Sequence, residues 1–221
     1  MEVLYGRNIP KKLYKKLIDL DAEIFTLTNE DFSGDTTMPE EALYSMLEKN
    51  ILSTVVVLDN EEVIAFFHTF PMEREFEKKY VKGEESFKNL NGSQVQAPKK
   101  GDINLYLWSL GIKESYRGKK FECNGEKVSI IQLLHEGLID SLVDMKRSGI
   151  VVKNVLGEAV SEKGRKVVVG FCGEDVLIHA DEKNSFYMYA APFNAKCPAF
   201  ARCRNVKNLI AAYSKEKINE K

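Results

Sequence analysis

The hydrophobic pattern of the first 50 residues predicts two helices. Apolar residues recur at helical spacing within residues 10–25, with lysines on the opposite side: Leu13, Leu17, Leu20 and Ile24. After a polar segment, Thr37-Met38-Pro39-Glu40 matches a capping box with a proline in the first turn. We therefore expect a second helix from about Pro39 to Lys49.

The spacing of apolar residues then changes from the helical period to the two-residue period of strands. Residues 53–70 contain two apolar runs joined by a short polar turn at 59–62, which predicts an antiparallel hairpin. Alternation divides the second strand into two faces, with Ile64, Phe66, His68 and Phe70 on one and Val63, Ala65 and Phe67 on the other. On such a face, His68 is expected to be a core or edge histidine.

The rest of the chain predicts strands that alternate with helices. A long charged stretch, 73–101, contains at most a short helix near 73–80. The expected elements that follow are a strand at 103–112, helices at 129–147 and 161–171, strands at 150–156 and on both sides of 181–184, and a helical tail. This order predicts an α/β fold with a mixed sheet. We treat 1–221 as one domain with a helical extension from about residue 200.

Composition and charge exclude some classes of function. The chain has 221 residues, 44% hydrophobic and 29% charged, and a formal net charge of −1, so the whole chain has no polyanion-binding character and no nucleic-acid partner is expected. The four cysteines form no CxxC pair and no metal-like cluster with histidine. No signal peptide and no apolar run of membrane length are found. We therefore expect a cytoplasmic protein with reduced thiols, no metal and no membrane partner.

A basic turn lies between the strand at 103–112 and the next helix. It reads Arg117-Gly118-Lys119-Lys120. Free N–H groups at a helix N-terminus bind phosphate, glycine lets a ligand approach the backbone, and cations attract polyanions. Two interpretations stay open from these residues: a pyrophosphate site, or a solvated turn with ordinary surface cations.

The same stretch, with the order of the elements, resembles the GCN5-related N-acetyltransferase (GNAT) family. In that family the turn after a central strand binds the pyrophosphate of acetyl-CoA, and residues 115–119, Ser-Tyr-Arg-Gly-Lys, match its common form. Asn154, Ala159 and the pair Gly170-Phe171 resemble the later part of the family pattern. The likeness covers most of 1–190 in element order and is specific over about 105–171.

The resemblance implies a GNAT-like twisted mixed sheet with helices on both faces. It also implies that strands 103–112 and 150–156 are parallel neighbours with a splayed gap between them. The implied activity is transfer of acetyl from acetyl-CoA to a primary amine of a small molecule or peptide by direct attack. The implied cofactor-binding residues are Leu110, Gly111 and Ile112 for pantetheine, Arg117, Gly118, Lys119 and Lys120 for pyrophosphate, and Asn154 for the same arm.

The chain departs from the family in two places. The segment 121–128, FECNGEKV, separates the basic turn from the helix, so it either bulges outward or alters the site. The tyrosine that many members place before the Gly-Phe pair is absent, and Lys166 stands near there. Candidates for the catalytic acid and base are Tyr106, Glu114 and Tyr187, each with a packing or surface role as its alternative.

Two other classes of function remain open. The chain is alternatively a non-catalytic acyl-CoA-binding or sensing protein of the same fold, or an unrelated α/β interaction protein whose basic turn is only a turn. Turnover separates the enzyme from the sensor, and affinity for CoA separates both from the interaction protein. Carboxylates at Asp31, Asp35, Glu40 and Glu41 are candidates for the acceptor wall. The oligomeric state, with a homodimer as one option, is open.

Overall fold

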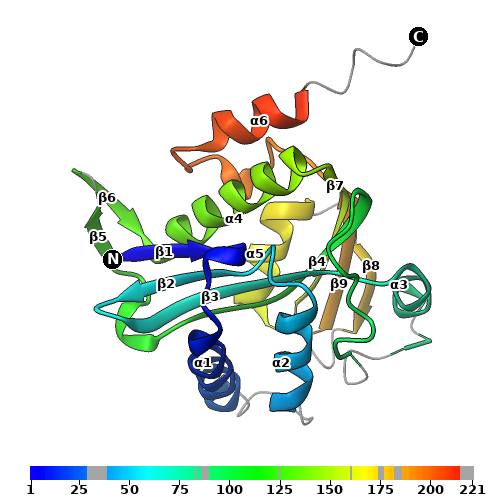
Figure 1. The fold of residues 1–221 in the computed structure, drawn as a ribbon, viewed down its shortest axis with the longest axis horizontal. Coiled ribbons are helices and arrows are strands. Elements are labelled where there is room, and N and C mark those ends of the chain that lie inside the picture. Colours follow the sequence, from blue (N-terminus) through cyan, green and yellow to red (C-terminus); the bar gives the residue numbers. More distant parts are fainter. Residues whose placement is uncertain are drawn as a thin grey trace.

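One mixed sheet organises the chain. The computed structural model describes residues 1–28, 39–82, 84–85, 90–123, 125–159, 161–173, 177–181 and 186–214. Seven of the described strands form a sheet in the order β1-β2-β3-β4-β7-β9-β8 (Figure 1). These strands are β1 (Glu2–Tyr5), β2 (Val55–Asp59), β3 (Glu62–Pro71), β4 (Gly101–Ile112), β7 (Ile150–Ala159), β8 (Leu177–Asp181) and β9 (Phe186–Pro192). Among the described strands, β4 and β7 form the only parallel pair, so the expected mixed sheet is confirmed.

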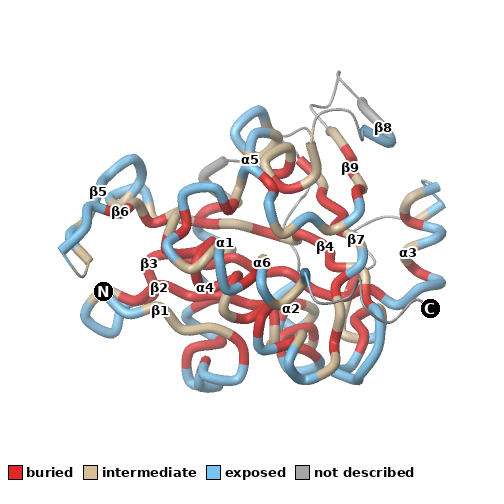
Figure 2. The backbone as a smooth tube through the Cα atoms, turned by 90° about the horizontal axis from the view of Figure 1, so that it is seen from above, coloured by how far each residue is buried: buried red, intermediate tan, exposed pale blue. Residues whose placement is uncertain are grey.

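Helices cover both faces of this sheet, as expected (Figure 1). One face carries α4 (Ile130–Arg147) and α5 (Glu162–Cys172), and α6 (Val206–Ser214) packs against α4. The opposite face carries α1 (Tyr14–Thr28) and α2 (Glu40–Lys49), and α3 (Arg74–Val81) joins the same apolar core through Phe76 and Tyr80. Buried residues line the strands and the inner sides of the helices (Figure 2).

Helix α4 begins and ends where its local sequence predicts, whereas Pro39 precedes α2 without a side-chain cap. The Oγ atom of Ser129 accepts a hydrogen bond from the backbone N–H of Gln132, which caps α4. Gly149 follows α4 with φ 84°, a conformation that glycine adopts without strain. The periodicity did not predict the four-residue strand β1, which is too short for a pattern of its own and pairs with β2, 50 or more residues away in the chain.

A bulge in β3 changes the two faces that alternation predicted. Val57 pairs with Ala65 but Leu58 pairs with Val63, so Ile64 is an extra residue in β3. Ile64 therefore packs with Ala65 on the α4 side, and Val63 packs on the α1 side. The predicted faces were wrong at Val63 and Ile64, because one extra residue reverses the order of side chains that follow it.

The segment that departs from the family pattern forms a separate hairpin of β5 (Lys120–Cys123) and β6 (Glu126–Ser129). This hairpin extends away from the main sheet and is mostly exposed (Figure 2). Lys120 pairs with Ser129, so the two ends of the insertion meet. Of the two arrangements expected for this segment, the structure shows the outward one.

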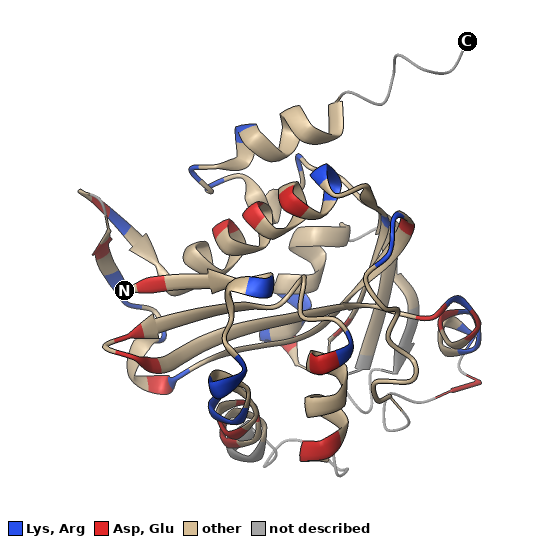
Figure 3. Ribbon diagram, in the orientation of Figure 1, with Lys and Arg blue, Asp and Glu red and all other residues tan. Residues whose placement is uncertain are grey.

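Basic and acidic residues are interspersed along the described helices and strands (Figure 3), in keeping with the formal net charge of −1. None of the described helices is both long enough and apolar enough to cross a membrane. The described residues also contain no group of three or more metal-ligating side chains that could hold an ion. Asp31 and Asp35 lie outside the described residues, whereas Glu40 and Glu41 lie in the first turn of α2.

Candidate functional site

The sheet opens between β4 and β7. The two strands pair from Gly101–Ile150 to Leu107–Gly157 and then separate, although β4 continues to Ile112. At the same point His68 pairs with Ser109 and Thr69 with Leu107, so β4 carries a bulge at Trp108. A bulge bends its strand and increases the local twist. We call the opening beyond Leu107 and Gly157 the fork. It confirms the expected parallel neighbours and the gap between them.

The predicted pantetheine-binding residues lie on the free edge of β4 at this fork. Leu110, Gly111 and Ile112 pair with β3 on one side and have no β7 partner on the other. The edge from Trp108 to Ile112 is about 17 Å long at ~3.4 Å per residue. Its backbone N–H and C=O groups need partners, so it can pair with an extended ligand. A Cβ atom on Gly111 would lie 2.5 Å from the Phe66 ring, so this position requires glycine.

The basic turn lies at the far end of that edge. The Tyr116 hydroxyl donates to Asp59 at 2.8 Å, and the Arg117 Nε donates to the Ile112 carbonyl at 2.8 Å. Gly118 has φ +71°, and a Cβ atom there would touch nothing, so glycine serves the backbone conformation. Lys119 is exposed, as is Lys120, and neither forms an ion pair within the described part of the chain.

The turn and the start of α4 are neighbours. Lys120 pairs with Ser129, and Ser129 is the N-cap of the 18-residue helix α4. The basic turn therefore lies beside the positive end of a long helix dipole. Cations, a left-handed glycine and helix N–H groups together form an arrangement that suits a phosphate group.

Asn154 lies outside the fork. It is in the paired part of β7, and its Nδ2 donates to the Oδ1 of Asn104 at 2.8 Å. Asn104 in turn donates to Glu77 on α3 at 2.6 Å. These bonds join β4, β7 and α3 before the strands separate. The predicted contact of Asn154 with the pantetheine arm gains no support from this geometry.

A carboxyl group with two phenols lies at the base of the fork. Glu158 follows Gly157, the last β7 residue that pairs with β4. The Tyr106 hydroxyl donates to its Oε2 at 3.0 Å, the Tyr80 hydroxyl donates to the same atom, and the phenols lie 3.0 Å apart. Burial raises the pKa of Glu158 to about 8 and also raises the pKa of Tyr106. Within the described residues, no cation pairs with Glu158.

Two more carboxyl groups contact the same face of β4. Asp21 on α1 accepts a hydrogen bond from the Ser109 hydroxyl at 3.0 Å, and burial raises the pKa of Asp21 to about 6. Burial also raises the pKa of Glu77, although its bond from Asn104 opposes that shift. Three positions of β4 thus contact carboxyl groups from three different elements. This face suits a cationic ligand better than an anionic one.

The three predicted catalytic residues lie in different places. Tyr106 is 2% exposed at the base of the fork. Glu114 is exposed beside the basic turn, in the 3-10 turn Glu114–Tyr116. Tyr187 is opposite Ala159 and lies on the α5 side, where the Arg165 guanidinium is 4.8 Å from its ring centre. The structure therefore brings only Tyr106 to the carboxyl cluster.

Sequence reasoning missed Glu158, Tyr80 and Asp21. One local signal pointed to Glu158, since it is a carboxylate in an otherwise apolar strand. Such a residue is rarely buried unless it has a partner. Tyr80 and Asp21 carry no comparable signal, because each lies on an ordinary amphipathic helix.

His68 and His135 are core residues. His68 is fully buried between Phe66 and Phe70, and burial lowers its pKa to about 3. His135 is 9% exposed, its Nδ1 lies 2.8 Å from the Ala199 carbonyl oxygen, and burial lowers its pKa to about 4. The expected structural role of His68 is confirmed, and neither imidazole reaches the fork cluster through a hydrogen bond in the described residues.

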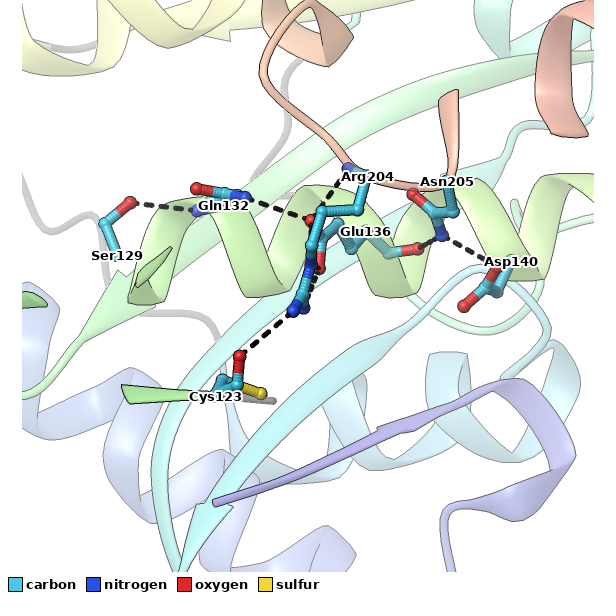
Figure 4. A network of polar contacts seen from close by, with 7 residues as sticks. All are labelled: Cys123, Ser129, Gln132, Glu136, Asp140, Arg204 and Asn205. Atoms are coloured by element: carbon cyan, nitrogen blue, oxygen red, sulfur yellow. Dashed lines mark hydrogen bonds and ion pairs between the residues drawn. The ribbon is translucent and has the colours of Figure 1, made fainter. Parts of the chain in front are cut away.

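A second carboxyl network holds the C-terminal segment against α4 (Figure 4). The Arg204 Nε lies 3.0 Å and 3.1 Å from the two oxygens of Glu136, and its backbone N–H donates to the same group at 2.9 Å. Asn205 donates to Asp140 at 2.7 Å, and the guanidinium also reaches the Cys123 carbonyl at 3.4 Å. Burial would raise the pKa of Glu136, but the hydrogen bonds from Arg204 lower it overall.

Comparisons with known proteins agree with this fold. No family model and no curated protein sequence matches the chain. Among solved structures, it is similar to an agmatine N-acetyltransferase mutant at 12% identity, over 87% of this chain and 100% of that chain, with a TM-score of 0.50. A GNAT acetyltransferase from Listeria monocytogenes matches at 10% identity, over 87% and 94%, with a TM-score of 0.49.

A third structure is a GNAT-like decarboxylase in complex with isobutyryl-CoA, at 14% identity over 79% of this chain and 74% of that chain, with a TM-score of 0.48. At identities this low, the likeness shows the fold. The predicted resemblance to the GNAT family is confirmed at that level.

Proposed function

We propose that this chain is an acyl-CoA-dependent N-acyltransferase that transfers acetyl from acetyl-CoA to a primary amine of a small molecule or peptide. The observation that carries this proposal is the separation of β4 from β7 after Leu107 and Gly157. It leaves an extended backbone edge between a basic turn and a cluster of carboxyl and phenol groups. An acyl-CoA has the matching order of groups: phosphates, an arm with amide groups, and a thioester.

The phosphate end of the ligand would meet the basic turn. Arg117, Lys119 and Lys120 supply the cations, Gly118 opens the backbone, and the α4 N-terminus adds its dipole. Exposed cations that lack structural ion pairs are available for such a role. The pantetheine arm would add its amide groups to the free edge at Leu110 and Ile112, as a partial strand.

The reactive end of the ligand would lie at the fork, where both strands begin to separate. The bulge at Trp108 interrupts the β3–β4 pairing beside this space, and backbone N–H groups there would be candidates to stabilise an oxyanion. Holding the thioester and the amine together supplies a large part of the rate. Of the predicted catalytic residues, Tyr106 hydrogen-bonds to Glu158 here, whereas Glu114 lies beside the basic turn and Tyr187 lies on the α5 side.

The acceptor would approach from the α1 and α3 side. Asp21, Glu77 and Glu158 contact β4 from that side, and burial raises the pKa of each. A cationic amine would stabilise the charged forms of these groups. This supports an amine acceptor rather than an alcohol or an acid.

The first test is calorimetric titration of the protein with acetyl-CoA and with CoA. We expect micromolar binding, and we expect Arg117→Ala/Lys119→Ala to weaken it by about tenfold or more, because charge-assisted contacts to phosphate are lost. The control Arg7→Ala/Lys12→Ala removes the same charge from exposed positions elsewhere and should bind like the wild type.

Turnover is then measured as thiol release with a panel of primary amines. Release with at least one amine supports the acyltransferase. Binding without release from any amine would instead favour the acyl-CoA sensor. No binding of either ligand would overturn the proposed function and reduce residues 105–120 to a strand and its solvated turn.

A further inference from the structure

Glu158 is a partly buried glutamate whose contacts do not explain it as a structural ion. Both phenol hydrogen bonds end on Oε2, and within the described part of the chain no hydrogen bond to Oε1 is found. The residue is only partly buried, whereas Tyr106 behind it is 2% exposed. Glu158 therefore lies between the core and the fork, with two donors on Oε2 and none on Oε1 among the described residues.

We propose that Glu158 is the general base of the acyl transfer, and that Tyr106 and Tyr80 position its carboxylate. This inference rests on the proposed function and adds the residue that removes the proton from the acceptor. Glu158 directly follows the last β4–β7 pair, so it lies where the two strands begin to separate. Tyr106 lies one residue before the last paired residue of β4, and on the same side of the sheet.

The step balances without any further reagent. Glu158 accepts one proton from the ammonium group of the acceptor, directly or through one water. The freed nitrogen lone pair attacks the thioester carbonyl carbon, so a C–N bond forms and the C–S bond breaks. The thiolate leaves and takes up the second proton that the nitrogen loses as the amide forms, directly or through water, while the proton on Glu158 returns to solvent.

The surroundings of Glu158 set its pH dependence. Its titratable neighbours are Tyr106 from β4 and Tyr80 from α3, and both are donors. Met188, opposite it on β9, does not titrate. Glu77 is the next carboxyl group on that side and binds Asn104. Arg165 lies on the α5 side, against Tyr187 and Tyr189.

Because burial raises the pKa of Glu158 to about 8, the carboxylate is a minor species at neutral pH. The base is active only when it is deprotonated. The value of kcat/KM should therefore rise with pH up to about 8 and then level off, until other groups titrate.

The decisive experiment compares Glu158→Gln with the wild type. We expect kcat/KM to fall by about 100-fold or more and the rising part of the pH profile to disappear. Acetyl-CoA affinity should change by less than about twofold, since the side chain does not contact the phosphates or the arm. Glu2→Gln removes a carboxylate from an exposed position on β1, at the opposite edge of the sheet, and is the control.

Two further variants separate a base from a structural residue. Glu158→Asp keeps a carboxyl group and should retain the pH-dependent rise at a lower kcat. Tyr106→Phe removes a donor that stabilises the carboxylate, so the rise should move to higher pH. A purely structural role for these residues would change protein stability but leave the midpoint of the pH profile where it is.

The outcomes distinguish the two proposals. If the wild type binds acetyl-CoA and turns over, but Glu158→Gln keeps its rate within about threefold and its pH profile, the role of Glu158 is overturned while the acyltransferase stands. If Glu114→Gln abolishes the pH-dependent rise instead, the base is at the other end of the edge and Glu158 is again excluded. Failure of the wild type to bind acetyl-CoA overturns both proposals.

Discussion

Two glutamates on opposite sides of the sheet are buried in different ways. Glu136 on α4 has a side chain that is 10% exposed, and it receives several hydrogen bonds from Arg204, which lower its pKa overall (Figure 4). Glu158 on β7 receives bonds from two neutral phenols, and burial raises its pKa to about 8. The first carboxylate is charged at neutral pH, and the second titrates near pH 8.

The difference shows what each group is suited to do. A guanidinium compensates the charge of Glu136 and so joins α4 to the C-terminal segment and, through Cys123, to the hairpin. Phenols donate hydrogen bonds without cancelling the charge, so Glu158 can gain and lose a proton. Perturbed carboxyl groups without a counter-ion are typical of functional sites. The predictions below test this contrast, beginning with the largest effect.

Loss of the guanidinium should produce the largest change in stability. In Arg204→Met, Glu136 remains buried without its cation, and we expect unfolding free energy to fall by about 3 kcal/mol. Urea denaturation at pH 7 measures this. Arg202→Met, at an exposed position two residues away, is the control and should change stability by less than about 0.5 kcal/mol. An equally small change in Arg204→Met would show that the guanidinium does not stabilise Glu136, and the contrast with Glu158 would not hold.

Removing the carboxyl group of Glu158, which titrates near neutral pH, should instead increase stability at high pH. The folded pKa of Glu158 is raised above its unfolded value, so its contribution is fully present below about pH 4.5 and is lost as the pH rises through about 8. Glu158→Gln should therefore gain stability relative to the wild type between pH 5 and 9. After discounting for partial solvent contact, we expect about 2 kcal/mol, measured by urea denaturation across that range. A difference that does not vary with pH would contradict it.

The contribution of Glu136 to stability should change with pH in the opposite direction to that of Glu158. Its pKa is lowered in the folded protein, so its contribution is present above about pH 4.5 and is lost as the pH falls. Glu136→Gln should therefore be less stable than the wild type at pH 7, and the two should converge in acid. We expect about 1 kcal/mol at pH 7, since glutamine still accepts hydrogen bonds. Parallel curves for the two proteins would exclude a charged pair.

The smallest expected effects come from removing one neutral hydrogen-bond donor from each carboxyl group. Tyr80→Phe removes a donor from Glu158 and should raise the midpoint of its pH profile by about half a unit, or roughly 0.7 kcal/mol. Gln132→Met removes the donor that lies 3.1 Å from Glu136 and should have almost no effect on stability, because the guanidinium dominates there. Equal effects at both sites would show that neutral donors control both groups.

Much of the fold was predictable because it follows from local periodicity. The helices of 14–28, 40–49 and 130–147 repeat apolar residues every three or four positions, and the hairpins have polar turns between apolar runs. The basic turn was also visible, since glycine and cations stand next to each other in the chain. The outward hairpin of 120–129 was one of two arrangements that the sequence left open.

Only the tertiary structure decided where the sheet opens and which carboxyl group lies there. The bulges at Ile64 and Trp108 each add one residue, which an alternating pattern does not reveal. Tyr80, Tyr106 and Glu158 lie 26 and 52 residues apart in sequence, and they meet because α3 and two parallel strands converge. Local spacing determines helices and strands, whereas a pKa depends on burial and on neighbours that folding brings from distant parts of the chain.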